Sequence, residues 1–231
     1  MSEPAIVLQD VDVVYRLPHS RRVSIKEFAR DWVGGALSYT EFRALEGVTL
    51  SIRKGESVAI VGSNGAGKST LLKVIAGALS PTRGTCSTMG ALSVVLDSGT
   101  CFDRELTGVE NIYLAGLLLG RTRAEVAVAL PGIIETSDLG EFIDSPMRSY
   151  SSGMSARLSF AVSMAWPVDF LLTDESLAVG DASFRERCWN RLRELQRRGQ
   201  GIIAVSHDAD TIGALCDRAI WIDQGRVRAE G

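Results

Sequence analysis

The fold of this chain is decided by the stretch Val61-Gly62-Ser63-Asn64-Gly65-Ala66-Gly67-Lys68-Ser69-Thr70. Its glycines allow positive φ angles and a close approach of the backbone, so successive N–H groups can point toward one anion. Lys68 adds a positive charge for terminal phosphates, and the Ser69 hydroxyl is a ligand for Mg²⁺, a cation that prefers oxygen. The stretch therefore predicts a binding site for a nucleotide polyphosphate, ATP or GTP, and its Mg²⁺.

The flanking residues supply the strand and the helix that such a loop connects. Residues 56–61 form a short apolar segment of strand type, and residues 70–76 have the pattern of a helix. The N-terminus of that helix would face the bound anion and add oriented amides and a favourable dipole. The alternative is a glycine-rich turn that binds nothing, and the strand-loop-helix context argues against it.

The composition is that of a globular protein with one large domain. The 231 residues are 45% hydrophobic and 23% charged, with a net charge of −3 and a pI near 5.5, which gives no general attraction to nucleic acid. The longest apolar stretch, residues 158–172, is interrupted by Pro167 and Asp169 and falls short of the roughly 20 residues that span a membrane. The N-terminus does not resemble a secretory signal, so we expect a cytosolic location.

Hydrophobic patterning predicts two subdomains around the phosphate-binding core. Apolar alternation over residues 5–15 and 45–52 predicts antiparallel strands, so residues 1–60 are expected to be mainly antiparallel β structure. Helical signals over residues 109–119 and 123–134 are broken by Gly120 and by Pro131-Gly132. They predict an inserted helical subdomain at about residues 100–160.

The second half of the chain alternates between strand and helix patterns. Strand patterns occur at residues 170–173, 201–206, 219–223 and 226–227, and helix patterns at about 155–165 and 183–198. This alternation indicates a mostly parallel sheet covered by helices, and hence an α/β fold.

A further amphipathic helix is expected at residues 24–35, between the two antiparallel strands. Ile25, Phe28, Ala29 and Trp32 recur at helical spacing, and charged residues fall between them. Packing on the protein's own core and contact with a partner or a membrane surface both suit this pattern. The sequence leaves both roles open.

Three further segments carry groups that suit nucleotide chemistry. Asp174 ends an apolar strand, where its carboxylate can reach the Mg²⁺ shell, and Glu175 after it can polarise an attacking water. The segment Tyr150-Ser151-Ser152-Gly153-Met154 precedes a helix, so the Ser151 hydroxyl and the amides that follow form a second anion-binding helix start. His207 follows a strand, where its imidazole could touch the γ-phosphate. Taken singly, these are also an ordinary strand end, an N-cap and a structural histidine.

Taken together and in this order, the segments resemble the ATP-binding cassette (ABC) family from Tyr15 to Gly225. The resemblance implies a P-loop NTPase core and one nucleotide-binding domain over residues 1–231. It implies a homodimer too, because two cassettes of this family face head to tail and hold each ATP between one phosphate loop and the partner's signature segment. The resemblance implies that Gly62 to Ser69 is the Walker A loop, with Thr70 also binding the nucleotide and Lys68 also catalytic. Asp174 would be the Walker B acid and Glu175 the catalytic base. The other implied roles are the signature for Ser151 and Gly153, the D-loop acid for Asp181 and the switch histidine for His207.

Two segments are similar to one branch of the family, the exporters of polysaccharide and teichoic acid. They are Tyr-Ser-Ser-Gly-Met at 150–154 and Asp-Glu-Ser-Leu-Ala-Val-Gly-Asp-Ala-Ser-Phe at 174–184. Residues 105–112 and the long insertion between Tyr15 and Leu45 also look like that branch. The resemblance implies an ATPase that powers a separate transmembrane permease from the cytoplasmic face of a bacterial plasma membrane, without a nucleic-acid partner. A soluble cassette in DNA repair or translation is one alternative, and a regulatory nucleotide-binding module with negligible hydrolysis is another.

Two departures qualify the resemblance, at Ser98 and at the C-terminus, and the role of Tyr15 stays open. Most cassettes have a glutamine where Ser98 lies, and the neighbouring Asp97 is either a metal or water ligand or an ordinary strand-end acid. Tyr15 occupies the place of the aromatic residue that stacks on adenine in the family, and a buried strand tyrosine is the alternative. Some relatives of the branch carry a C-terminal carbohydrate-binding domain, whereas this sequence stops soon after Gly225.

Overall fold

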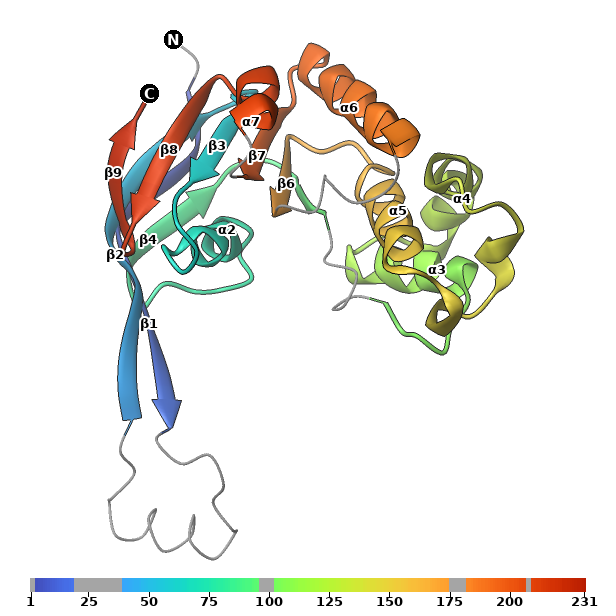
Figure 1. The fold of residues 1–231 in the computed structure, drawn as a ribbon, viewed down its shortest axis with the longest axis horizontal. Coiled ribbons are helices and arrows are strands. Elements are labelled where there is room, and N and C mark those ends of the chain that lie inside the picture. Colours follow the sequence, from blue (N-terminus) through green and yellow to red (C-terminus); the bar gives the residue numbers. More distant parts are fainter. Residues whose placement is uncertain (1–2, 19–38, 96–101, 175–181, 207–208) are drawn as a thin grey trace, which may run out of the picture.

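The residues that the computed structural model describes, 3–18, 39–95, 102–174, 182–206 and 209–231, form two sheets and a group of helices (Figure 1). Among them, the larger sheet has six strands in the order β5-β6-β7-β3-β8-β9. These strands are β3 (Val58–Val61), β5 (Leu92–Val94), β6 (Phe170–Asp174), β7 (Gly201–Val205), β8 (Arg218–Asp223) and β9 (Arg226–Glu230). All neighbours run parallel except β8 and β9, so the carboxyl ends of the parallel strands share one edge of the sheet.

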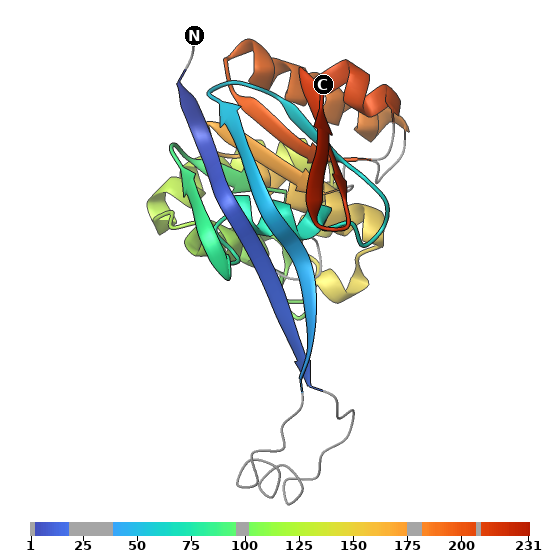
Figure 2. The same ribbon diagram turned by 90° about the vertical axis from the view of Figure 1, so that its left-hand side faces the viewer.

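The smaller sheet is antiparallel and has the order β2-β1-β4 within the described residues. Its strands are β1 (Pro4–Pro18), β2 (Tyr39–Arg53) and β4 (Arg83–Thr88). Leu45, Val48, Leu50 and Ile52 of β2 are buried and the residues between them are mostly exposed, as expected for a sheet with one solvated face. The outer halves of β1 and β2 continue as a two-stranded ribbon beyond the rest of the sheet (Figure 2).

Helix α2 (Lys68–Ile75) lies between the two sheets and contacts both. Its buried residues Leu71, Leu72, Val74 and Ile75 join one hydrophobic core with side chains from β1, β2, β3, β6, β7 and β8. The helix begins at the end of the phosphate-binding stretch. The largest core among the described residues therefore directly supports that stretch.

Helices α3 (Gly108–Leu118), α4 (Arg123–Ser137) and α5 (Ser152–Ser163) pack around a separate core, together with the short 3-10 helices η1 (Gly140–Asp144) and η2 (Met147–Ser149). Thr107 and Thr122 begin α3 and α4, each in a capping box with a glutamate three residues later. These helices lie away from α2 and the smaller sheet (Figure 1). None of the helices in the described ranges combines the length and the apolar character needed to span a bilayer.

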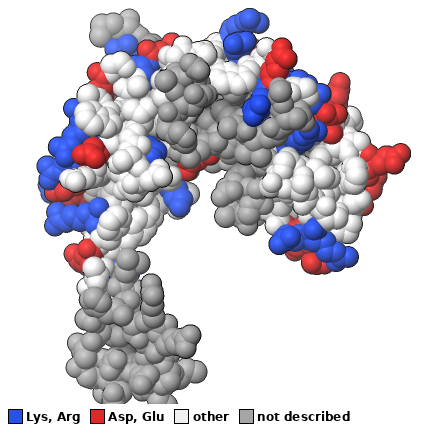
Figure 3. Space-filling view, in the orientation of Figure 1, with Lys and Arg blue, Asp and Glu red and all other residues white. Residues whose placement is uncertain are grey.

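Helices α6 (Ala182–Arg197) and α7 (Ala209–Leu215) follow β6 and β7 in the chain. Phe184, Leu192 and Leu195 of α6 join Leu171 and Ile202 of the larger sheet in a third core. Phe160 of α5 and Met164, the C-cap of this helix, belong to the same core, so α5 bridges the helical group and the sheet. On the face shown in Figure 3, positive and negative side chains are interspersed.

The α/β fold with a mostly parallel sheet and an antiparallel sheet is confirmed. The expected break at Pro131-Gly132 is wrong, because α4 continues through Pro131 to Ser137. Val126 and Ile133 are buried on either side of the exposed proline, and their packing outweighs the lost backbone hydrogen bond, a cost of about 3 kcal/mol in a helix interior. The sequence patterns also missed β4, β5 and α7. The expected helix at residues 24–35 lies outside the described residues.

Candidate functional site

The phosphate-binding stretch is folded so tightly that two of its glycines have no room for a side chain. At Gly62, with φ +154°, an added Cβ would lie 2.1 Å from the Ile222 carbonyl oxygen of β8. At Gly67, with φ +108°, it would lie 2.5 Å from the Ala44 carbonyl oxygen of β2. Both sheets therefore press directly on the loop and fix its shape. Glycine is required at these positions by close backbone approach as well as by positive φ.

Lys68 lies at the start of α2 and folds back over the loop. Its Nζ donates hydrogen bonds to the carbonyl oxygens of Gly62, at 2.9 Å, and Ser63, at 3.0 Å. The residue is only 7% exposed, and the first turn of α2 contains no acidic side chain. An enclosed ammonium beside the positive end of a helix favours a bound anion. The residues present therefore fit the polyphosphate of a nucleotide.

A pocket of about 560 Å³ opens beside the loop, within the usual range for a small-molecule site. It brings together several predicted site residues from the loop and from β6. It is lined by Phe42, Ala44, Asn64, Gly65, Gly67, Lys68, Ser69, Thr70, Val95 and Asp174. Of the other predicted loop residues, Ala66 is buried, and its carbonyl oxygen accepts a hydrogen bond from the Gly225 N–H.

Asp174 reaches this pocket because of the order of the strands. It is the exposed last residue of β6, after four buried residues, and it pairs with Val205 at the end of β7. Strand β7 in turn lies next to β3, which leads into the loop. The carboxylate is therefore at the same sheet edge as the Ser69 hydroxyl. Two oxygen groups of this kind suit Mg²⁺.

Phe42 is a pocket residue that the sequence analysis missed. It is 50% exposed, and it lies two residues before Ala44 on the same face of β2. Tyr15, the predicted adenine-stacking residue, is directly opposite Phe42 in the β1–β2 ladder and packs partly against the main core. The two aromatics are neighbours because the antiparallel register of β1 and β2 places them opposite each other. Pairing the two predicted strands in this register would have pointed from Tyr15 to Phe42.

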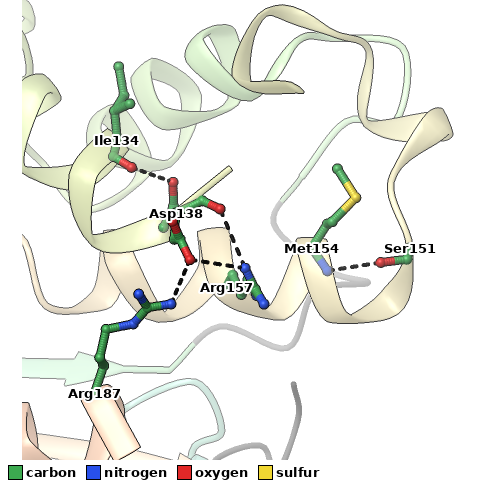
Figure 4. A network of polar contacts seen from close by, with 7 residues as sticks. Ile134, Asp138, Ser151, Met154, Arg157 and Arg187 are labelled. Atoms are coloured by element: carbon green, nitrogen blue, oxygen red, sulfur yellow. Dashed lines mark hydrogen bonds and ion pairs between the residues drawn. The ribbon is translucent and has the colours of Figure 1, made fainter. Parts of the chain in front are cut away.

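The second predicted anion site is the start of α5. Ser151 is the N-cap, and its Oγ accepts a hydrogen bond from the Met154 N–H at 3.2 Å (Figure 4). Tyr150 donates from its hydroxyl to the Phe142 carbonyl oxygen at 2.7 Å. Burial and the nearby Asp144 carboxylate raise the pKa of Tyr150, so the hydroxyl stays a donor. The first turn of α5 carries no acidic residue and can receive an anion.

A second groove, also of about 560 Å³, runs beside this helix start. It is lined by Asp138, Leu139, Gly140, Glu141, Phe142, Ser151, Gly153, Met154 and Arg157. Among the described residues, none lines both this groove and the pocket beside the phosphate loop. Within one chain, the structure thus keeps the phosphate loop and the Ser151 segment apart.

Five predicted positions lie outside the described residues: Asp97, Ser98, Glu175, Asp181 and His207. Three of them are next to described elements in the sequence. Glu175 comes directly after Asp174, Asp181 directly precedes α6, and His207 follows β7 by two residues. Their roles stay predictions.

Sequence comparison gives a family. Residues 45–178 match the ABC transporter family model. The O-antigen export system ATP-binding protein RfbB of Klebsiella pneumoniae is 43% identical over 231 residues, which cover 99% of this chain and 94% of the relative. The protein of the same name from Myxococcus xanthus is 43% identical over 100% of this chain and 54% of its own length. The teichoic acids export ATP-binding protein TagH of Bacillus cereus is 37% identical over 98% of this chain and 40% of its own length.

Solved structures agree with this result at the level of the fold. A dimeric bacterial ABC transporter cassette has a TM-score of 0.77 at 22% identity, with 98% of this chain and 97% of that chain covered. A dimeric cassette in a post-hydrolysis state with ADP and Pi has a TM-score of 0.75 at 22% identity, with the same coverage. The family match over more than half of the sequence and the near-complete alignment with RfbB show that this chain belongs to the ABC transporter family, as one of its ATPase cassettes.

Proposed function

We propose that this chain is the ATP-binding and hydrolysing subunit of a transporter that exports a lipid-linked polysaccharide, such as an O-antigen, a capsule or a teichoic acid. The observation that carries the proposal is the pocket in which Lys68, Ser69 and Asp174 meet beside the phosphate loop. The 43% identity to an O-antigen export protein over 99% of this chain supports the class of cargo. The polymer itself would be selected outside the described pocket.

Each pocket residue has a distinct part in the proposed reaction. The loop amides and the Lys68 ammonium bind and orient the phosphates. The Ser69 hydroxyl and the Asp174 carboxylate would hold Mg²⁺, which neutralises phosphate charge when it is bound. Glu175, next to Asp174, would accept a proton from the attacking water, and His207, two residues beyond β7, would contact the γ-phosphate. Asp97 is a further candidate metal or water ligand.

The separation of the two grooves supports a homodimer. The start of α5 has free anion-binding capacity, yet its groove is separate from the phosphate loop of the same chain. A second copy placed head to tail would bring Ser151 and Gly153 of one chain to the nucleotide of the other. ATP would then join the two copies, and hydrolysis would release them, because the γ-phosphate favours the closed state. Asp181, just before α6, would lie near this interface.

The transmembrane path would belong to a separate permease. We place the cassette pair at the cytoplasmic face of a bacterial plasma membrane, held there by that permease. The names of the RfbB and TagH relatives, which describe export systems, support this arrangement. Co-purification of the tagged chain from bacterial membranes with a multi-span protein is the expected result, and co-purification with nucleic acid instead would contradict it.

Replacement of Glu175 by glutamine tests the hydrolytic role. The variant should bind Mg-ATP normally, lose turnover and form an ATP-dependent dimer, because the water loses its base while every phosphate contact remains. Lys68→Ala should instead lose nucleotide binding, and Lys73→Ala, which changes an exposed lysine of the same helix, should behave like the wild type. Phosphate release, nucleotide titration and light scattering measure the three properties. Wild-type turnover in Glu175→Gln would remove Glu175 from the base role, and a monomeric ATP complex would contradict the dimer.

A further inference from the structure

One carboxylate connects three helices beside the second groove. Asp138, which ends α4 in the left-handed region with φ +52°, accepts from Arg187 of α6 at 2.6 Å between Oδ2 and Nη2. The same Oδ2 accepts from Nη1 of Arg157 in α5 at 3.4 Å, and this nitrogen also donates to the Asp138 carbonyl oxygen at 3.4 Å (Figure 4). The C-terminal end of α4 is thereby linked to side chains of α5 and α6.

Phe184 of α6 packs its ring against both arginines of this network. Its ring is 3% exposed, and the guanidinium carbons of Arg157 and Arg187 lie over it at 5.1 Å and 5.8 Å from the ring centre. The ring also meets Phe160 of α5 edge-on, with 6.0 Å between ring centres. The contacts of Phe184 with Arg157 and Phe160 join α6 to α5, whereas its contact with Arg187 lies within α6. Asp138, Arg157, Arg187 and Phe184 are called the three-helix cluster below.

The position of Arg157 links the three-helix cluster to the anion-binding helix start. Arg157 lies about one and two-thirds turns after Ser151, its side chain is 19% exposed, and it lines the same groove as Ser151 and Gly153. Farther along, Phe160 of α5 and its C-cap Met164 pack toward α6 and the sheet. The fully buried residues of α5 begin at Leu158, and within the helix before it the partly buried Met154 packs against the helical core. The three-helix cluster adds a polar connection to α4 and α6 in this less buried part of the helix.

We propose that the three-helix cluster is a positioning device: the Asp138–Arg187 ion pair holds the start of α5 at a fixed place relative to α6, and so aims Ser151 at the nucleotide of a second copy. This inference rests on the proposed function. The residues that line the phosphate pocket do not include Asp138, Arg157, Phe184 or Arg187, so we expect the cluster to act on closure of the dimer and on turnover, and to leave binding of nucleotide to one chain intact. Half-exposed ion pairs contribute little to folding, which separates positioning from stability.

Two substitutions test the positioning role. Asp138→Asn removes the charge and keeps a residue that tolerates left-handed backbone, and Arg187→Gln removes the α6 partner. Arg198→Gln is the matched control, because Arg198 is a similarly exposed arginine that pairs with Glu194 at the opposite, C-terminal end of α6. We expect about a tenfold loss of kcat in each test variant, below the roughly hundredfold loss that a 1 Å misplacement can cause. The Kd for ATP of a single chain should change less than about twofold.

Dimerisation gives a second readout that a purely structural role would not move. In the Glu175→Gln background, each test variant should weaken the ATP-dependent dimer about tenfold, and Asp138→Asn with Arg187→Gln should be no worse than the stronger single change. Arg187→Lys should restore part of the loss, because it keeps the charge and loses the planar fork.

Several results would overturn the positioning role. These are wild-type turnover and dimerisation in both test variants, losses that multiply in the double variant, a parallel loss of single-chain ATP affinity, or unfolding of Arg187→Gln at a temperature where Arg198→Gln stays folded. The failure of the proposed function looks different. In that case the wild-type chain itself would neither hydrolyse ATP nor dimerise with it.

Discussion

The molecule contains two helix starts suited to anions, and they are built in opposite ways. The start of α2 is formed by backbone: Gly67 is its N-cap in left-handed conformation, no side chain caps it, and both sheets press on the loop before it. The start of α5 is formed by side chains, with Ser151 as the cap and the three-helix cluster around Arg157. The comparison indicates that the phosphate loop is a rigid part of the fold, whereas the proposed closure of a dimer would depend on a part held by polar contacts.

Alanine at matched glycines of the two helix starts should give the largest difference. Gly67→Ala would place a Cβ 2.5 Å from the Ala44 carbonyl oxygen at φ +108°, whereas Gly153→Ala would meet only the Ser151 Oγ at 3.8 Å. We expect Gly67→Ala to lower the free energy of unfolding by about 3 kcal/mol or more, and Gly153→Ala to change it by less than about 1 kcal/mol. Urea denaturation measures both.

The same glycine pair separates stability from turnover. Gly153→Ala should lower ATP turnover in spite of its normal stability, because the added methyl group lies at the surface proposed to meet a second copy. Equal stability losses at the two glycines would show that the α5 start is as tightly enclosed as the phosphate loop. The contrast drawn between the two regions would then be wrong.

Local sequence was sufficient for the α2 region and insufficient for the surroundings of α5. The phosphate loop, its strand and its helix are contiguous, so glycine spacing and apolar periodicity predicted them directly. The three-helix cluster joins Asp138, Arg157 and Arg187 from three separate helices, and only tertiary packing brings them together. No local pattern marks such residues.

Two further misses have the same physical origin. Strand β4, with its exposed or half-buried Arg83–Thr88, lacks the apolar alternation of a strand and exists because β1 pairs with it. Pro131 was expected to end a helix, but the buried residues on both sides of it hold α4 together. Propensity is a weak signal where packing decides.

Replacement of the two facing aromatics of the β1–β2 ribbon should give an intermediate effect. Phe42→Ala should raise the Kd for ATP about tenfold, near the lower end of the roughly 1–3 kcal/mol found for base stacking, and leave stability almost unchanged because the ring is half exposed. Tyr15→Ala should destabilise the fold, because Tyr15 packs against the main core. Titration with a fluorescent ATP analogue and thermal melting measure the two effects.

Phe42→Trp is the control for the aromatic role, since it keeps a ring at the pocket edge. An unchanged Kd in Phe42→Ala, together with a raised Kd in a folded Tyr15→Ala, would assign base contact to Tyr15 alone. The adenine base would then contact Tyr15, which packs against the main core, and the whole nucleotide site would belong to the rigid part of the fold.

The smallest expected effect concerns pH and two ion pairs, one in each region. Burial raises the pKa of Glu56, but hydrogen bonds from the Arg53 N–H and the Arg218 guanidinium outweigh it and hold the pKa below its ordinary value. A lowered folded-state pKa stabilises the protein above the ordinary pKa, and this stabilisation disappears as the pH falls through the folded-state value. The Arg218 Nε and Glu56 Oε1 atoms are 2.6 Å apart, and both side chains are largely enclosed near the N-terminal ends of β3 and β8.

Glu56→Gln should therefore lower the free energy of unfolding by about 1 kcal/mol at neutral pH, and the difference from the wild type should shrink as the pH falls through the acid range. Glu105→Gln is the matched variant of the helical region, because Glu105 pairs with Arg148 and both side chains are well exposed. It should cost less than about 0.5 kcal/mol at neutral pH. Urea denaturation over a series of pH values measures both. A larger cost at Glu105 than at Glu56 would mean that polar contacts stabilise the helical region more strongly than the core around the phosphate loop, which reverses the order inferred from burial.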